Sequence, residues 1–179
     1  MHVKENMQNQ DFMITNEADL LQYLDKQRIS YRRIEHPAVF TCEEAELYRP
    51  KDDDVLVAVS TKNLFLCDKK GRRFYLVITD CEKRLDLYDL AGKLGERKLR
   101  FASEQKLLFY LGVIRGAVTM LGLINDREGK VALYIDPEVW RSHTFLCHPL
   151  VNTATLVIAK PDLQRFFQLS GHEIKLVEM

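Results

Sequence analysis

The stretch that decides the fold reads Asn63-Leu-Phe-Leu-Cys67-Asp-Lys-Lys-Gly71-Arg-Arg-Phe74-Tyr-Leu-Val-Ile-Thr79. Two apolar runs, each about the length of a strand, flank a charged turn that contains glycine. Such a turn between two apolar runs is a hairpin signal, because glycine reaches the positive φ that tight turns require. The sequence therefore predicts a β-hairpin, with the lysines of the turn in solvent.

Outward from this hairpin, short helices and short strands follow in irregular order. A capping box at Thr41 and Glu44 predicts the start of a short helix, since each side chain reaches the other residue's backbone amide. Further helices are expected at 17–27, at 85–94, after Ser103 and after Pro161. Strands are expected at 31–34, 55–60, 144–147, 154–159 and 172–177, and a second hairpin over 123–135, turning at 126–129.

The length and the element order bound the fold. A chain of 179 residues is one domain by the usual length prior. Strands and helices without a regular alternation indicate a mixed α/β (α+β) class rather than a doubly wound sheet. We expect residues 1–14 to be a flexible leader and residues 15–179 to form a single compact domain, with a curved mixed β-sheet or barrel-like core flanked by helices.

The charges balance overall but not locally. With 26 basic and 26 acidic residues the chain is no wholesale polyelectrolyte, although residues 62–106 alone hold 12 Lys and Arg against 7 Asp and Glu. That excess is either a solvated face, which composition alone favours, or a footprint for a polyanion. The longest apolar runs are about one strand long, so no membrane span is expected. The polar N-terminus lacks an apolar signal core, and the expected location is cytoplasmic.

The four cysteines indicate no metal site. Cys42, Cys67, Cys81 and Cys147 lie far apart, without the close pairs that structural zinc sites use. The expectation is buried or incidental thiols in a reducing compartment. Cys67 and Arg73 have the spacing of cysteine phosphatases, but a charged hairpin turn offers no helix N-terminus to hold a phosphate, so this match is set aside as chance.

Four blocks of sequence, in order, resemble the prolyl-tRNA editing domain family (the INS/YbaK-like trans-editing proteins). They are His36-Pro37-Ala-Val-Phe40-Thr41, Ser60-Thr-Lys62-Asn63-Leu-Phe65, Gly116-Ala-Val-Thr119-Met-Leu-Gly122-Leu123 and His148-Pro149-Leu-Val-Asn152-Thr153-Ala-Thr155. Within that family the chain looks most like the freestanding Ala-tRNA(Pro) deacylases. The resemblance covers most of the chain and implies the fold of the YbaK and prolyl-tRNA-synthetase-associated domains.

The resemblance also implies an activity. These proteins hydrolyse the ester between a wrongly attached amino acid and the terminal adenosine of tRNA(Pro), most often alanine. A synthetase pocket shaped for proline cannot strongly reject a smaller side chain, because one missing methylene is worth only about 1–3 kcal/mol, so a second hydrolytic sieve is needed. The implied partner is the acceptor end of misacylated tRNA(Pro), with prolyl-tRNA synthetase or an elongation factor as a further partner. Neither a cofactor, a metal, DNA nor a membrane is implied.

Three residues carry the catalytic roles that the resemblance implies. Lys62 would contact the phosphate or ribose of the terminal adenosine, which suits a mobile point charge. Gly116 would let backbone approach the ester carbonyl and the attacking water. His148 would bind the substrate or retain water, and its pKa range also permits a general base, although the resemblance implies that the substrate's own 2′-hydroxyl takes that role. From the residues alone, a solvated lysine is favoured for Lys62 and a plain turn glycine is about as well supported for Gly116. For His148 the structural alternative is a histidine that caps a turn before Pro149.

Further residues of the same blocks would bind the substrate. They are Thr41, Asn63, Ala117, Val118, Thr119, Met120, Asn152 and Thr153. Thr41 is already explained by its capping box. Met120 stands where the family usually has proline, so the loop loses a fixed φ and a flexible thioether is expected to alter the pocket floor and the acyl specificity.

Two alternatives remain open at the level of sequence. The first is a non-catalytic module that binds tRNA or prolyl-tRNA synthetase, which would need no pocket. The second is the same deacylation on Cys- or Ser-charged tRNA, which pocket volume would decide.

Overall fold

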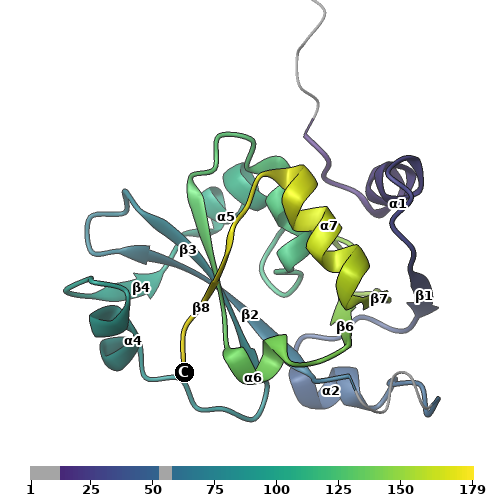
Figure 1. The fold of residues 1–179 in the computed structure, drawn as a ribbon, viewed down its shortest axis with the longest axis horizontal. Helices are drawn as coiled ribbons and strands as arrows, with labels where there is room; N and C mark the ends of the chain where they lie inside the picture. The colour runs from purple at the N-terminus through teal and green to yellow at the C-terminus, as the bar shows by residue number, and fades with distance from the viewer. Residues whose placement is uncertain (1–12, 53–57) are drawn as a thin grey trace, which may run out of the picture.

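The fold contains two β-sheets and a set of short helices (Figure 1). The structure, a computed structural model, describes residues 13–52 and 58–179. Residues 55–57 of the strand predicted at 55–60 therefore lie outside the described residues, and within 58–60 only Val59 forms a bridge. In the described part no helix is long and apolar enough to cross a membrane.

The larger sheet grows from the predicted hairpin. Its five strands are in the order β4-β2-β3-β5-β8. The hairpin strands β2 and β3 are antiparallel, and β4 pairs antiparallel with β2, whereas β5 and β8 continue the sheet in parallel. The sheet is thus mixed, as predicted, and it does not close into a barrel. The strand bounds are β2 (Thr61–Asp68), β3 (Phe74–Asp80), β4 (Leu99–Phe101), β5 (Val131–Ile135) and β8 (Ile174–Leu176).

The smaller sheet is antiparallel and has the order β1-β7-β6. Its strands are β1 (Arg32–Glu35), β6 (Thr144–Cys147) and β7 (Ala154–Ala159). A parallel bridge between Val59 and Phe145 connects β6 to the residues that lead into β2. The bridge therefore places β6, an edge strand of the smaller sheet, beside the residues that precede β2.

The helices begin where their capping residues predict. Asn16 accepts a hydrogen bond from the amide of Asp19, and the complete capping box at Thr41 starts the second helix. The helices are α1 (Glu17–Lys26), α2 (Cys42–Glu46), α4 (Leu87–Lys93), α5 (Glu104–Leu111), α6 (Pro137–Trp140) and α7 (Lys160–Ser170), with one 3-10 helix, η1 (Met120–Asn125). Sequence patterns did not indicate α6 or β4, which are only four and three residues long.

The two faces of β2 contact different cores. Phe65 and Cys67 belong to the main core, which the two sheets share with α1, α5 and α7, whereas Leu66 packs into a smaller cluster beneath α4. Successive side chains of a strand point to opposite faces, so this parity assigns Asn63 to the face of the main core and Lys62 to the opposite one. Both residues lie at the beginning of the strand, where neither core is complete.

The predicted second hairpin is wrong. The turn at Asp126 exists, but the residues before it form η1 instead of a strand, and β5 pairs in parallel with β3. The reason is packing on both sides of the apolar run: Leu121 and Leu123 are both fully buried, and Gly122 lies so close to α5 that a Cβ would stand 2.9 Å from Leu111. A run buried all round has no solvent face for a hairpin strand.

Candidate functional site

A cavity of about 290 Å³ lies where the smaller sheet, α2 and the beginning of β2 meet. Its walls come from stretches that are far apart in the sequence. They include Ile34 of β1, the residues around α2, the first residues of β2, the loop after α5, and the loop between β6 and β7. Lys62, Gly116 and His148 all line this cavity, as do Thr41, Asn63 and Val118.

The loop after α5 contributes Gly116 through its backbone conformation. The φ of Gly116 is +89°, which L side chains rarely adopt, and a Cβ at this position would stand 3.1 Å from a ring carbon of Phe40. The phenyl ring of Phe40 therefore covers the bare backbone directly. Phe40 itself is 69% exposed, so this contact forms part of the rim of the cavity.

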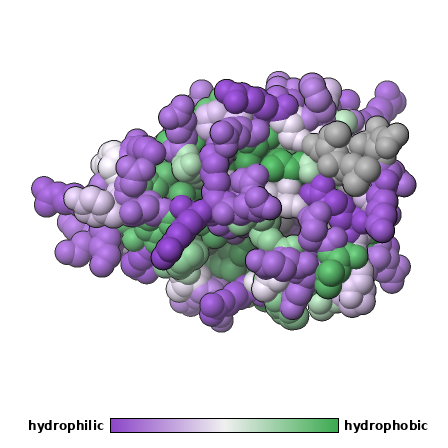
Figure 2. Space-filling view, turned by 90° about the horizontal axis from the view of Figure 1, so that it is seen from below, coloured by the Kyte–Doolittle hydropathy of each residue, from purple (hydrophilic) through white to green (hydrophobic). Residues whose placement is uncertain are grey.

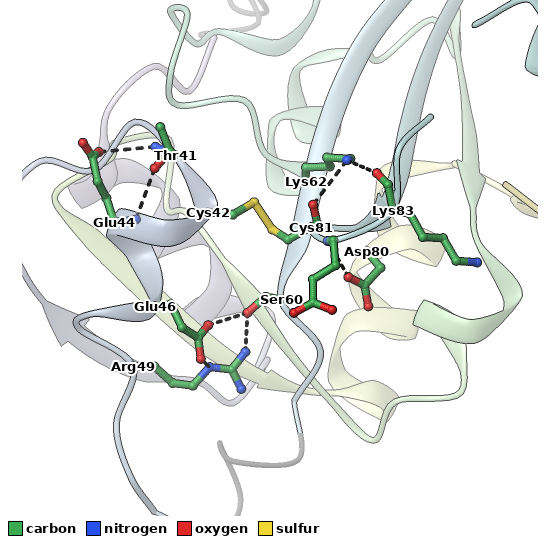
Figure 3. The surroundings of a disulfide bond; sticks show 11 residues. Thr41, Cys42, Glu44, Glu46, Arg49, Ser60, Lys62, Asp80, Cys81 and Lys83 are labelled. Atoms are coloured by element: carbon green, nitrogen blue, oxygen red, sulfur yellow. Dashed lines mark hydrogen bonds and ion pairs between the residues drawn. A yellow bond between two sulfur atoms is a disulfide. The ribbon is translucent and has the colours of Figure 1, made fainter. Parts of the chain in front are cut away.

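The Lys62 side chain is held by main-chain oxygens. Its ammonium donates hydrogen bonds to the carbonyl oxygens of Cys81, at 3.3 Å, and of Lys83 (Figure 3). Within the described residues no carboxylate lies within ion-pair distance of this ammonium. Its positive charge is therefore positioned without a direct ion pair, although it contributes to lowering the pKa of Glu43, and such a charge suits attraction of a phosphate or another anion at the cavity.

His148 is held in the neutral form. Burial, and secondly the neighbouring His36, lower the pKa of His148 to about 4. The centroids of these two imidazole rings lie 6.2 Å apart, and His36 stacks in turn on Tyr48 at 5.8 Å. At neutral pH the His148 ring carries no charge, so it can offer hydrogen bonds but is a weak base.

His36 is a cavity residue to which the sequence analysis gave no role. It is 8% exposed, and its Nδ1 lies 2.8 Å from the carbonyl oxygen of Pro37. Because a carbonyl only accepts, Nδ1 carries the hydrogen in the neutral ring, and Nε2 accepts from the hydroxyl of Thr155 at 2.9 Å. The sequence signal was the His36-Pro37 pair itself, which lies in the first block of the resemblance.

Cys42 and Cys81 form a disulfide, which corrects the expectation that all four cysteines are thiols (Figure 3). The bond joins α2 to the residue after β3, with Cα atoms 6.1 Å apart, and both cysteines line the cavity. The spacing of 39 residues carries no local motif, so only the fold could bring them together. Cys67 and Cys147 are unpaired and buried, and burial raises the pKa of both thiols, which makes neither a thiolate nucleophile.

A polar cluster of Glu46, Arg49 and Ser60 forms a further part of the wall and was also missed (Figure 3). The Arg49 guanidinium lies 2.7 Å from a Glu46 carboxylate oxygen, and the Ser60 hydroxyl donates to the other oxygen at 2.7 Å. Arg49 also donates to the carbonyl oxygen of Ala58 at 2.7 Å. The cluster links the C-terminal end of α2 to the residues that enter β2. The i,i+3 spacing of Glu46 and Arg49 was its sequence signal.

Five predicted substrate-binding residues do not line the cavity. Ala117 and Met120 are buried in the main core, and Thr119 is buried as the N-cap of η1, accepting from the amide of Leu121. The predicted effect of Met120 on the pocket floor thus has no contact to act through. Asn152 and Thr153 instead hydrogen-bond the 36–39 segment from behind.

Comparison with known proteins gives one consistent result. Residues 36–166 match the model of the aminoacyl-tRNA editing domain family. The chain is 38% identical over 156 residues to a prolyl-tRNA editing protein ProX of Acetoanaerobium sticklandii, covering 87% of this chain and 93% of the relative. It is 41% identical over 156 residues to the prolyl-tRNA synthetase associated domain-containing protein 1 of Danio rerio, covering 86% and 82%.

Solved structures agree on the fold. A crystal structure described as a putative trans-editing enzyme for prolyl tRNA synthetase superposes with a TM-score of 0.64, over 93% of this chain and 99% of the other, at 19% sequence identity.

Proposed function

Because this chain belongs to the aminoacyl-tRNA editing domain family, we propose that it is a trans-editing hydrolase which deacylates misacylated tRNA(Pro), with alanine as the acyl group. The observation that supports this most is the convergence of Lys62, Gly116 and His148 on one cavity from distant parts of the chain. A module that only docks on tRNA or on a synthetase has no need of such a cavity.

The reaction is the hydrolysis of an ester. A water oxygen bonds to the carbonyl carbon, the bond from that carbon to the ribose oxygen breaks, and the ribose oxygen takes a proton. The products are the free amino acid and uncharged tRNA. Lys62 holds the phosphate or ribose of the terminal adenosine, and the backbone at Gly116 approaches the ester carbonyl. Thr41, Asn63 and Val118 line the space around the substrate.

His148 acts as a hydrogen-bonding group rather than as the general base. A base works best when its pKa lies near the working pH, and the pKa of His148, at about 4, is well below neutrality. Proton transfer from the attacking water is therefore assigned to the substrate's own 2′-hydroxyl, the role that the family resemblance implies. The neutral ring orients the substrate or the water.

The residues behind the cavity hold its walls in place. Asn152 accepts a hydrogen bond from the amide of Val39 through its carbonyl and donates to the carbonyl of Val39 through its side chain, at 3.0 Å in each case. Thr153 accepts from the amide of His36. Together with Ala117, Thr119 and Met120, they act as positioning residues for the two segments that meet at Gly116 and Phe40.

The size of the cavity supports a small acyl group. About 290 Å³ is at the lower end of the range in which ligand pockets fall, and part of this volume must hold the ribose. Ile34, Val39 and Leu146 add apolar surface to the lining, which suits a methyl group. Alanine meets both conditions better than a larger or more polar side chain.

Deacylation of a panel of substrates tests the proposal. Purified protein is mixed with tRNA(Pro) charged with labelled alanine, serine, cysteine or proline, and release of the amino acid is followed. We expect fastest release of alanine and release of proline at the spontaneous rate. Alanine release no faster than without protein would overturn the enzyme assignment. A preference for cysteine or serine would keep the chemistry and change the substrate.

A further inference from the structure

The surface around the turn of the β2–β3 hairpin lies away from the cavity and carries an excess of positive charge. The reaction proposed for the cavity gives this charge no role. Residues 68–73 and 96–100 together hold seven Lys and Arg side chains and two acidic ones, in a chain that is neutral overall. The antiparallel pairing of β2 with β4 places these two segments side by side. We call this surface the hairpin patch. Its exposed cations are Lys69, Lys70, Arg72, Arg73, Arg97, Lys98 and Arg100.

The two acidic residues of the hairpin patch leave most of its cations without an ion pair. Asp68 is 4% exposed, and its carboxylate accepts hydrogen bonds from the backbone amides of Arg72 and Arg73. These amides lower the pKa of Asp68, so it is a charged but internal part of the turn. Glu96 pairs with Arg73 and accepts from Tyr75. Among the described residues, no carboxylate lies within ion-pair distance of the remaining six cations.

The arrangement brings like charges close together in the free protein. The register pairs Cys67 with Arg100 and Asp68 with Leu99, and continuing it beyond the ladder sets Lys69 opposite Lys98. Like charges at facing positions of an antiparallel pair destabilise it. Arg100 also folds back over the turn, with a guanidinium nitrogen 3.0 Å from where a Cβ on Gly71 would stand. A bound polyanion would relieve this repulsion.

We propose that the hairpin patch binds the phosphate backbone of the double-helical acceptor arm of the tRNA whose end enters the cavity. This inference rests on the proposed function, because it takes tRNA as the substrate. Lys62 and Asp68 lie at opposite ends of β2, about 20 Å apart at the rise of a strand. That distance is several nucleotides, so the patch meets the helix beyond the single-stranded end. Exposed Lys and Arg side chains suit phosphates and read shape rather than sequence.

The pictures show the same separation. Figure 1 places the hairpin, β4 and α4 at one end of the molecule and α2 at the opposite end. Figure 2 shows hydrophilic residues at the hairpin end, as at the other edges of this face, while hydrophobic residues reach the surface nearer the middle.

Salt-dependent binding of tRNA tests the patch. The variant replaces Lys69, Lys70 and Arg72 by Gln, and the matched control replaces the exposed Lys26, Arg141 and Arg165 by Gln, with the same change in net charge. Affinity for an uncharged tRNA(Pro) transcript is measured by fluorescence anisotropy at several salt concentrations. We expect the hairpin variant to bind about tenfold more weakly and the slope of log K against log salt to become shallower by about 1–3, since each lost phosphate contact removes about one unit.

A second substrate separates the patch from the cavity. The hairpin variant should hydrolyse alanine esterified to the trinucleotide CCA as fast as the unmodified protein, because this substrate does not reach the patch. Equal tRNA affinity and equal salt slope in the hairpin variant and the control would overturn the inference. Unchanged tRNA binding with lost binding to prolyl-tRNA synthetase would also overturn it, in favour of a protein contact. If the unmodified protein deacylates nothing but the binding effect is seen, the patch stands and the proposed function fails.

Discussion

At the Lys62 end of β2 the surroundings come from stretches of chain far apart in the sequence, whereas at the Lys69 end the hairpin turn meets the nearby residues 96–100. The Lys62 end encloses a cavity lined by half-buried polar groups, and a disulfide fastens its wall. The Lys69 end has exposed cations on a short turn. One strand thus joins a site that depends on long-range contacts to a surface formed by local sequence, and the two should respond differently to substitution.

The largest expected difference is in the effect of removing Lys62. Lys62→Ala should lower deacylation of Ala-tRNA(Pro) by roughly 10- to 100-fold, the range for a lost hydrogen bond to a charged group. Its rate on the alanyl-CCA substrate should fall by the same factor, unlike that of the hairpin variant. Initial rates on both substrates measure this, with Lys26→Ala as the control. Unfolding of Lys62→Ala in a urea titration would show that the residue is structural instead.

Breaking the disulfide should lower the stability of the protein, because the bond fastens the cavity wall at the Lys62 end of β2. Replacing Cys42 and Cys81 by Ser is expected to lower the free energy of unfolding by roughly 2–4 kcal/mol, because the bond closes a loop of 39 residues. Urea unfolding with and without a reductant measures it. Reductant should destabilise the unmodified protein and leave the double variant unchanged. Equal stability of the unmodified protein and the double variant, with Cys42 and Cys81 of the unmodified protein reacting as free thiols, would argue that the bond does not form.

A pair of glycine variants distinguishes the effect of backbone strain from the effect of the Phe40 contact at the rim of the cavity. Gly116→Ala should cost roughly 1–3 kcal/mol of stability for its positive φ, and it should also slow deacylation because the new methyl displaces Phe40. Gly129→Ala is the matched control, since its φ is +63° but nothing lies within 4 Å of an added Cβ. It should be destabilised and fully active. Equal activity of the two variants would contradict a role of the Phe40 contact.

The pH dependence of stability reports on His148. Its pKa is about 4 in the folded protein and about 6.5 when unfolded, so between these values the unfolded state binds the extra proton and stability rises with pH. The contribution is at most about 1.4 kcal/mol per pH unit. His148→Gln should flatten the slope of unfolding free energy in that window.

Activity gives the complementary measurement on His148. The ratio of the unmodified rate to the His148→Gln rate should stay constant from about pH 5.5 to about pH 8, because the ring is neutral throughout. A ratio that falls as the pH is lowered, with an inflection near pH 7, would indicate a general base instead.

The smallest effect is expected at Met120. It is buried in the main core and does not line the cavity, so Met120→Leu should cost less than about 1.5 kcal/mol and leave the order of acyl preference unchanged. The substrate panel measures the preference, with Val118→Ala, which widens the cavity lining, as the contrasting variant. A changed preference in Met120→Leu would mean that packing in the main core alters the shape of the cavity.

Local signals in the sequence were reliable at both ends of β2. The glycine at position 71 predicted the turn, and the Thr41 capping box predicted α2, because each depends on residues within four positions. The wall of the cavity depends on distant partners. Nothing near Cys42 indicated Cys81, and nothing near Ser60 indicated Glu46 and Arg49.

The secondary structure of a segment that is buried on both sides also cannot be predicted from its hydrophobic pattern. The apolar residues of η1 have the composition of a strand, and only the close approach of α5 makes them a buried turn. The resemblance to a family located Lys62, Gly116 and His148, whereas Phe40 and His36 gained their places from contacts that no spacing rule contains.

The hydrogen bonds of Lys62 to the carbonyl oxygens of residues 81 and 83 set limits on how this protein can vary. Main-chain oxygens are supplied by every amino acid, so exchange of side chains in that loop leaves the resting place of the ammonium intact. Insertion or deletion of a residue there would move the acceptors themselves. Cys81 and Lys83 have further roles, in the disulfide and in the ion pairs of Lys83 with Asp136 and Glu138, so natural drift should change the side chain of residue 82 most freely while keeping the number of residues constant.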